Sequence, residues 1–390
     1  MTAPPSRQRV ITRPFAFAWL AYFVYFAAGS ALWPVLALFV EGELGGTNSD
    51  VGVAVGVFAV TAILARPFVG RFGDKSGRRP LVLMGSLLVV VTTAAYVFVE
   101  VLMVLIVLRL IQGVAEAMYF TGANASVADM APDERRGEAL SLFSVALYAG
   151  FSIGPLLGEA VFKAFGFDVL WLASAALSLF AFFFSLGVPE SKPLDIEPIR
   201  GALINRKGLL PGIVIAASVW GFTGFFAFVP LYARELGMSG SRFVFATYSV
   251  TVLTIRLLGA RIPDRYGARR TTSVCMAISV IGLWLIAGIH APWALYAGAA
   301  ILGIGQSLSF PALFSLAIES ASPGERVSVI STFTAFLDIA FGLGPFTLGI
   351  VADLTSYNGT FFASSLVTAA GLGLLLVRAH QQRPARSQAA

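Results

Sequence analysis

Twelve apolar segments constrain this chain more than any other feature of its sequence. Each holds roughly 20 or more mostly uncharged residues, the length that an α-helix needs to cross a bilayer. They lie at 14–40, 50–72, 80–98, 101–128, 137–162, 167–187, 209–233, 241–262, 271–289, 292–318, 327–352 and 358–377. Only 12% of the residues are charged, whereas a soluble domain is about one quarter charged. The sequence therefore predicts an all-α membrane protein with twelve transmembrane helices, and it disfavours the alternative of two soluble helical domains.

A charged loop between two of these segments occurs twice. Residues 70–79 read GRFGDKSGRR, and a diluted copy follows 190 positions later. The same offset relates Arg71, Asp74, Lys75, Gly77 and Arg79 to Arg261, Asp264, Arg265, Gly267 and Arg269, and relates Arg66, Gly113, Phe120, Gly154 and Pro155 to Arg256, Gly303, Phe310, Gly344 and Pro345. Repeated matches at one offset indicate an internal duplication. We expect two six-helix bundles, at 1–190 and 209–390, joined by a polar cytoplasmic linker at 191–208.

The distribution of lysine and arginine predicts the orientation. Of these 27 residues, three lie deep inside apolar segments and three lie in or next to the loops on the side away from the termini: Arg66, Arg109 and Arg256, then Lys163, Arg234 and Arg242. The others lie in the termini, the linker and the loops on the opposite side, which the positive-inside rule places in the cytoplasm. Both termini are therefore expected to be cytoplasmic, in a multi-pass protein of the cell (inner or plasma) membrane. Because the net charge of +6 is spread over these loops, it does not indicate nucleic-acid binding.

Four sequence motifs resemble those of the major facilitator superfamily, and the resemblance covers nearly the whole chain. Residues 70–79 resemble its loop motif between the second and third helices, and Arg109-x-x-Gln112-Gly113 resembles its fourth-helix motif. Gly150-x-x-x-Gly154-Pro155-x-x-Gly158 is similar to the fifth-helix motif of proton-driven exporters, although Glu159 stands where a second glycine is usual. Residues 129–137 resemble a loop of drug:proton antiporters. The resemblance implies transport by alternating access and is strongest to the bacterial drug and sugar efflux group.

The loop motif implies an inner gate. In the superfamily such charges latch the two bundles on the inner side, a role that the resemblance assigns to Asp74, Arg78 and Asp129. The glycines of the loop permit tight turns and close backbone approach. The full sets are Gly70, Asp74, Gly77, Arg78, Arg79 and Asp129 in the first half, and Asp264, Gly267 and Arg269 in the second. The alternative is that these charges only set the topology and are solvated in a loop.

Polar residues near the middle of apolar segments indicate a central site. Glu116 lies near the middle of 101–128 and Asp338 near the middle of 327–352, and the duplication pairs them with Gln306 and Tyr148. Since a carboxyl group in a low-dielectric environment favours its neutral form, either acid could carry a proton. The alternative is a structural pair of Arg109 with Glu116. The predicted proton-coupling and substrate cavity comprises Glu116, Asp338, Arg109, Gln306, Tyr148, Asn124, Trp220 and Tyr25.

Other residues in the apolar segments keep two interpretations. Gly150, Gly154, Pro155 and Gly158 present small residues four apart, which favours close helix packing as much as any functional role. Arg66 and Arg256 could extend toward the cytoplasmic interface. Glu159 is expected to be an interfacial or gating residue. The aromatic residues of 14–40 and 209–233 could stack on an aromatic or cationic substrate, although most are expected to pack against other helices or lipid.

We therefore predict a secondary active transporter that exports a small organic molecule (a drug, sugar or metabolite) by antiport with protons. The alternatives are a proton-coupled uptake symporter and a membrane sensor that transports nothing. No nucleophile–base arrangement or Walker A motif is present, so we do not expect an enzyme. One cysteine and two histidines do not provide a Cys/His metal site, and no cofactor is predicted. The expected partners are the substrate, protons and the lipid bilayer, without nucleic acid, and the protein is expected to be a monomer.

Overall fold

The computed structural model describes residues 10–132, 135–191, 205–259, 262–319 and 326–381. The first half contains α1 (Arg13–Gly42), α2 (Asn48–Gly56), α3 (Phe58–Ser76), α4 (Arg79–Ala94), η1 (Ala95–Phe98), α5 (Leu102–Met130) and α6 (Arg136–Leu186). The second half contains α7 (Arg206–Glu235), α8 (Arg242–Gly259), α9 (Ile262–Tyr266), α10 (Ala268–Gly288), α11 (Pro292–Glu319), α12 (Arg326–Leu354) and α13 (Tyr357–Gln381). Most of the predicted linker lies outside the described residues.

Helix α6 is two membrane spans in one. It is 51 residues long, about 75 Å at 1.5 Å per residue, whereas the apolar core of a bilayer is about 30 Å thick. The backbone leaves the helical region at Gly166, where φ is 83° and ψ is −175°, a conformation that glycine adopts without steric penalty. Within the described residues, eleven helices are long and apolar enough to cross a membrane, when α2 and α3 are counted as one span and α6 is counted once. Divided at Gly166, they agree with the twelve predicted segments.

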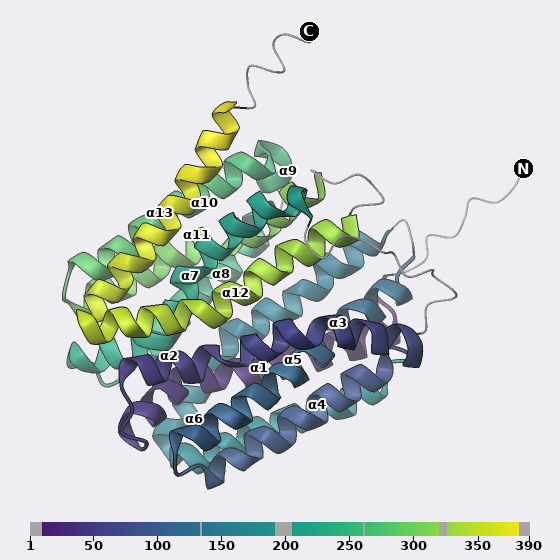
Figure 1. The fold of residues 1–390 in the computed structure, drawn as a ribbon, viewed down its shortest axis with the longest axis horizontal. Coiled ribbons are helices and arrows are strands. Elements are labelled where there is room, and N and C mark those ends of the chain that lie inside the picture. The colour runs from purple at the N-terminus through teal and green to yellow at the C-terminus, as the bar shows by residue number, and fades with distance from the viewer. Residues whose placement is uncertain (1–9, 133–134, 192–204, 260–261, 320–325, 382–390) are drawn as a thin grey trace, which may run out of the picture.

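The helices run between two ends of the molecule (Figure 1). We call the end where α1 begins and α13 finishes the terminal end, and the end where α1 finishes and α2 begins the distal end. Helix α12 of the second half runs beside α2 and α3 of the first, and α8 runs beside α6. These two contacts, together with that of α1 with α7, join the halves.

The outward-facing side chains fit a lipid environment. Phe68, Phe98 and Leu258 are 70%, 81% and 83% exposed, which would be unfavourable for so many large apolar residues in water. The interior holds large aromatic side chains, among them Tyr22, Tyr119, Trp171, Phe225 and Phe245. The chain is therefore apolar both inside and outside, as its composition predicts for a membrane protein.

The duplication is visible in the backbone. Gly77, between α3 and α4, has φ 95°, and Gly267, between α9 and α10, has φ 83°. Side chains other than glycine rarely adopt this left-handed region. The two copies of the charged loop thus turn at corresponding glycines.

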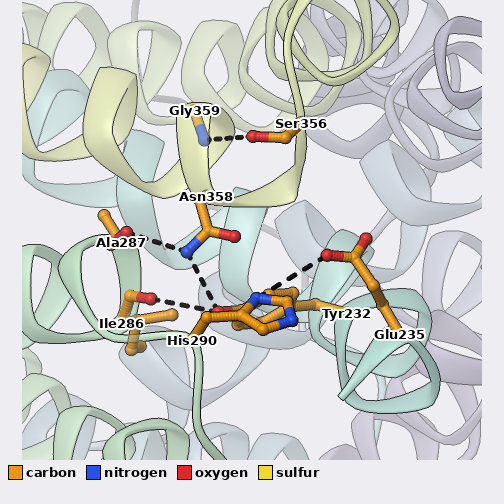
Figure 2. Close-up of polar contacts among 8 residues, drawn as sticks. All are labelled: Tyr232, Glu235, Ile286, Ala287, His290, Ser356, Asn358 and Gly359. Carbon is orange, nitrogen blue, oxygen red and sulfur yellow. Dashed lines mark hydrogen bonds and ion pairs between the residues drawn. The ribbon is translucent and has the colours of Figure 1, made fainter. Parts of the chain in front are cut away.

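A polar cluster joins α7, α10 and α13 at the distal end of the second half (Figure 2). Asn358 donates hydrogen bonds to the Tyr232 hydroxyl at 3.1 Å and to the Ala287 carbonyl at 2.8 Å. His290 lies 3.8 Å from Glu235. All of these residues belong to one half, so the cluster stabilises that half and leaves the interface between the halves to other residues.

Candidate functional site: a cavity between the halves

A cavity lies at the interface between the two halves. Helices of the first half supply most of its wall, and α12 closes the other side through Thr334, Leu337, Asp338 and Phe341. Its surface is mostly apolar. The charged and amide side chains that reach it are Arg66, Arg109, Gln112, Glu116 and Asp338. A mostly apolar pocket with a few convergent polar groups is the usual form of a small-molecule site.

An ion pair crosses the cavity from one half to the other. Arg66 of α3 contacts Asp338 of α12 through Nε at 2.8 Å and Nη2 at 2.9 Å, so the two groups meet in a two-pronged geometry. The guanidinium also lies 5.0 Å from the centre of the Phe120 ring. Asp338 is only 8% exposed, and an unpaired charge there would be costly. The Arg66 side chain therefore points to the other half of the protein inside the cavity. It does not extend toward the cytoplasmic surface of the membrane.

The duplicated position carries a related contact without an acid. Arg256 of α8 is the counterpart of Arg66, and Tyr148 of α6 is the counterpart of Asp338. The Arg256 guanidinium lies 3.3 Å from the centre of the Tyr148 ring. The two contacts, Arg66 with Asp338 and Arg256 with Tyr148, are therefore equivalent under the duplication. Of these two equivalent contacts, only the one at Asp338 joins an arginine to a carboxylate.

Arg109 binds the break in the second membrane span. This span consists of α2 and α3, which are interrupted at Val57. Arg109 donates to the carbonyls of Ala54 at 2.7 Å and Val55 at 2.6 Å, and to Gln112 at 3.1 Å. Carbonyls in the last turn of a helix lack intrahelical donors, so the guanidinium satisfies them. These three hydrogen bonds go to the break and to Gln112, and within the described residues Arg109 forms no ion pair with Glu116.

Glu116 and Tyr25 line the same cavity. Glu116 makes no ion pair within the described part of the chain, although Arg66 and Asp338 lie close enough to interact with it electrostatically. Four of the predicted cavity residues, Glu116, Asp338, Arg109 and Tyr25, are therefore brought together. The lining also includes Arg66 and Gln112, which the sequence-based set omits.

The other four predicted cavity residues lie outside this lining. Gln306 donates to the Ser218 carbonyl at 2.8 Å, and Asn124 donates to the Tyr22 hydroxyl at 2.9 Å. Trp220 packs against two buried apolar clusters, one within the second half and one formed by residues of both halves. Tyr148 lies under Arg256, as described above.

Carboxylates at helix N-termini hold the distal end closed. Asp353, at the end of α12, accepts hydrogen bonds from the backbone N–H groups of Asn48 at 3.0 Å and Ser49 at 2.8 Å, where α2 begins. Glu159 of α6 is 1% exposed and accepts from the N–H of Ser241 at 2.7 Å, where α8 begins. Helix N-termini favour negative charge. Each bond joins one half to the other, and Lys163 adds an ion pair to Glu159 at 3.0 Å and a hydrogen bond to the Ser239 carbonyl.

Glycines allow α2 and α12 to touch directly. A Cβ atom on Gly56 would overlap the carbonyl oxygen of Gly342, and one on Gly52 would overlap that of Pro345. Close backbone approach through small residues is typical of packed membrane helices. The contacts of Gly52 and Gly56 lie on the distal side of Asp338, so the halves meet tightly on that side of the cavity.

The charged loop at the terminal end is organised within the first half. Arg78 pairs with Asp129 at 3.5 Å, and Glu190 accepts from the backbone N–H groups of Arg78 at 2.7 Å and Arg79 at 3.2 Å. Ser191 donates to Asp129 at 3.1 Å. The described contacts of Asp129 and Glu190 thus tie α4, α5 and the end of α6 together. The side chains of Asp74 and Asp264 lie outside the described residues, and a latch between the halves remains a prediction.

The glycine motif of α6 faces α1. A Cβ on Gly150 would lie 2.9 Å from the Phe23 carbonyl oxygen, and Cβ atoms on Gly154 and Gly158 would also meet the α1 backbone. Ser30 of α1 donates to the Gly150 carbonyl at 3.0 Å. These residues pack two helices of the same half together, in agreement with the packing interpretation.

Comparisons with known proteins agree with this architecture. The sequence profile of the Major Facilitator Superfamily matches residues 18–262 and 212–390. An uncharacterized MFS-type transporter of Salmonella typhimurium is 27% identical over 358 residues, which cover 89% of this chain and 92% of that protein. The uncharacterized MFS-type transporter YhhS of Escherichia coli K12 is 24% identical over 359 residues, covering 90% of this chain and 88% of that protein.

Solved structures share the fold at low sequence identity. A bacterial homologue of the human lysosomal transporter Spinster, in an inward-facing and occupied conformation, has a TM-score of 0.77 at 14% identity, covering 94% of this chain and 96% of that one. A mutant of the nucleoside transporter NupG has a TM-score of 0.75 at 13% identity, covering 93% and 99%. A human organic anion transporter has a TM-score of 0.71 at 20% identity, covering 96% and 100%. The chain therefore belongs to the major facilitator superfamily and is a twelve-helix membrane transporter.

Proposed function

We propose that this transporter exports a small organic molecule in exchange for protons. The observation that carries the proposal is the Arg66–Asp338 ion pair, which joins the two halves inside the cavity. Protonation of Asp338 removes its charge and deprives Arg66 of its ion-pair partner. A proton bound here therefore changes a contact between the halves, which is what coupling of a proton to alternating access requires.

The asymmetry between the duplicated contacts supports Asp338 as the coupling group. Arg256 rests on the ring of Tyr148, and this contact does not depend on the ionisation of a carboxyl group. Of these two contacts, only the one between α3 and α12 changes when a carboxyl group binds a proton. If protonation weakens the Arg66–Asp338 contact and leaves the Arg256–Tyr148 contact unchanged, one half can rock against the other.

The closed distal end indicates to which side of the membrane this conformation is closed. Contacts of Asp353, Glu159 and Gly56 close the interface on the distal side of the cavity. If the terminal end is cytoplasmic, as the positive-inside rule predicts, this is a state closed toward the outside. We further propose that residues 1–190 and 209–390 move as two bodies around this site, joined by 191–208.

The sign of a pH gradient tests antiport against uptake by symport, which is the second candidate. Purified protein is placed in liposomes, and a radiolabelled ligand is chosen by a thermal-shift screen, because a ligand of the native state raises its apparent stability. Antiport accumulates the ligand in an acidic lumen whichever way the protein is inserted, whereas symport accumulates it in an alkaline lumen. Protein-free liposomes correct for passive trapping of weak bases. Accumulation in the alkaline lumen alone would replace export by uptake.

Reporter fusions test the orientation. Fusions after Gly46, Gly166 and Gly240 are expected to report the outside, and fusions after Ser76 and Lys192 the inside, because the basic loops remain in the cytoplasm. The measurement is the activity of a reporter that works on one side of the membrane only. An outside signal from the Lys192 fusion would contradict both the orientation and the division into two six-helix halves.

Loss of a distal carboxylate is expected to loosen the closed distal end. Glu159→Gln removes a buried charge that Lys163 and Ser241 share, so its effect should exceed that of Asp353→Asn, since the Asp353 side chain is exposed. The interaction of one charge with a helix terminus contributes about 0.3–2 kcal/mol of stability, which each variant would lose. Both variants should increase labelling of a Thr223→Cys reporter, in a Cys275→Ser background, by an impermeant reagent on the distal side.

The control for the distal variants is Glu100→Gln, which removes an exposed carboxylate away from these contacts. Its labelling rate should equal that of the parent protein. Equal labelling of all three variants would show that the carboxylates do not hold the distal end closed.

A further inference from the structure

We infer that the cavity selects an organic cation with an aromatic or apolar body, and that Glu116 binds its positive charge. The inference rests on the proposed transport function and adds the chemical class of the substrate. It comes from comparing which charged groups of the cavity are already engaged within the protein and which one is left for a ligand.

The two arginines of the cavity are engaged. Arg109 directs Nε, Nη1 and Nη2 to the carbonyls of α2 and to Gln112. Its guanidinium also lies 4.7 Å from the centre of the Phe58 ring, so one of its faces is covered. Arg66 directs Nε and Nη2 to Asp338. A negatively charged ligand would have to displace these partners, and displacing Asp338 or the α2 carbonyls would leave buried polar groups without partners.

Glu116 is the carboxylate that remains available. It lines the cavity and is hydrogen-bonded to the Tyr25 hydroxyl, but within the described residues it makes no ion pair, in contrast to Asp338. Arg66 forms its ion pair with Asp338 and acts on Glu116 only through a longer-range electrostatic interaction. A ligand cation that reaches this carboxylate would provide the pairing that a charge at this depth in a membrane requires.

Aromatic rings surround the same space. Tyr25, Phe26, Trp33, Phe120 and Phe151 of the first half line the cavity, and Phe341 lines it from the second. Trp33 lies 4.9 Å from Phe151 and 6.2 Å from Phe341 between ring centres, so these rings form a continuous apolar wall on the distal side of the site. Aromatic faces attract cations and bury apolar groups. A carboxylate without an ion pair beside such a wall favours a lipophilic cation over a sugar, which needs many hydrogen-bonding partners.

Binding of two matched ions tests the inference without any pH gradient. Tetraphenylphosphonium and tetraphenylborate have nearly the same shape and opposite charge. The purified full-length protein is expected to bind radiolabelled tetraphenylphosphonium and to bind tetraphenylborate at least about tenfold more weakly, a ratio that a single charge contact can supply. Equal or tighter binding of tetraphenylborate would overturn the assignment of a cation site.

Variants locate the charge that binds the cation. Glu116→Gln should weaken tetraphenylphosphonium binding by about tenfold or more, while Glu116→Asp should retain most of it. Glu100→Gln, the loss of an exposed carboxylate elsewhere, should bind as the parent does. Size-exclusion profiles and thermal unfolding verify that each variant is folded. Undiminished binding by folded Glu116→Gln would refute the role of Glu116.

The two proposals can fail separately. Binding at equilibrium does not depend on coupling, so a protein that binds the cation through Glu116 but shows no gradient-driven accumulation would retain the cation site and lose the antiport proposal. Gradient-driven accumulation of a neutral or anionic ligand, unaffected by Glu116→Gln, would retain antiport and refute the cation site.

Discussion

Asp338→Asn is expected to abolish gradient-driven accumulation while leaving substrate exchange in the absence of a gradient. The asparagine has the shape of a protonated aspartate and can still accept a hydrogen bond from Arg66, which contacts Asp338 at 2.8 and 2.9 Å. It carries no charge at any pH, so the contact between α3 and α12 no longer changes when protons bind. We expect accumulation in proteoliposomes to fall to the level of protein-free liposomes. Exchange should stay within about tenfold of the parent rate, because the variant keeps the cavity and loses less than about 1.4 kcal/mol of barrier stabilisation in that reaction.

The duplicated position offers a matched control for this variant. Tyr148→Phe retains an aromatic ring beneath Arg256, at the site equivalent to Asp338. Its gradient-driven accumulation should therefore stay close to that of the parent. If Asp338→Asn still drives full uphill transport with an unaltered pH dependence, Asp338 does not carry the proton, and Glu116 becomes the leading candidate.

Gly56→Val is expected to prevent closure of the distal end. Even the Cβ atom would overlap the Gly342 carbonyl oxygen and lie 3.1 Å from its carbon, so α2 and α12 must separate. Overpacking of a close contact costs about 1–3 kcal/mol. A destabilisation of this size lowers the population of the closed conformation about 5- to 150-fold. Transport should fall accordingly, because every cycle passes through the distal-closed state.

The control for Gly56→Val is Gly373→Val in α13, where a Cβ atom would meet nothing within 4 Å. Both changes add the same side chain to a membrane helix, so a difference between them reports on the α2–α12 contact. Labelling of the Thr223→Cys reporter from the distal side should increase in Gly56→Val and stay unchanged in Gly373→Val. Normal transport by folded Gly56→Val would show that the tight contact is dispensable.

The apolar stretches and the duplication predicted the fold well, because a membrane requires each spanning helix to be apolar and long enough to cross it. An apolar stretch of sufficient length marks a span whatever its partners are. The duplication also predicted equivalent turns, and the glycines at 77 and 267 both have positive φ. The break between α2 and α3 was missed, since Val57 and its neighbours include no proline. The hydrogen bonds from Arg109 stabilise the broken end, and such distant donors leave no local signal.

The partners of the polar residues were harder to predict than their positions. The offset of the duplication relates Arg66 to Arg256 but does not say which helix of the other half each one faces. The link of Arg66 to Asp338 depends on how the halves dock, and so does the contact of Arg256 with Tyr148. Glu190 carried no comparable signal in the sequence, because its contact with the start of α4 joins segments that lie 111 positions or more apart.

The central claim is that protons act on the contact between the halves through Asp338. Distances between spin labels at Ser76→Cys and Arg270→Cys, both exposed near the terminal end, measure the separation of the halves there in a Cys275→Ser background. No substrate is needed for this measurement. In the parent protein we expect the distance distribution to shift between acidic and alkaline pH, whereas Asp338→Asn should show one distribution at both, resembling that of the parent at acidic pH. The same pH-dependent shift in Asp338→Asn and in the parent would contradict the account.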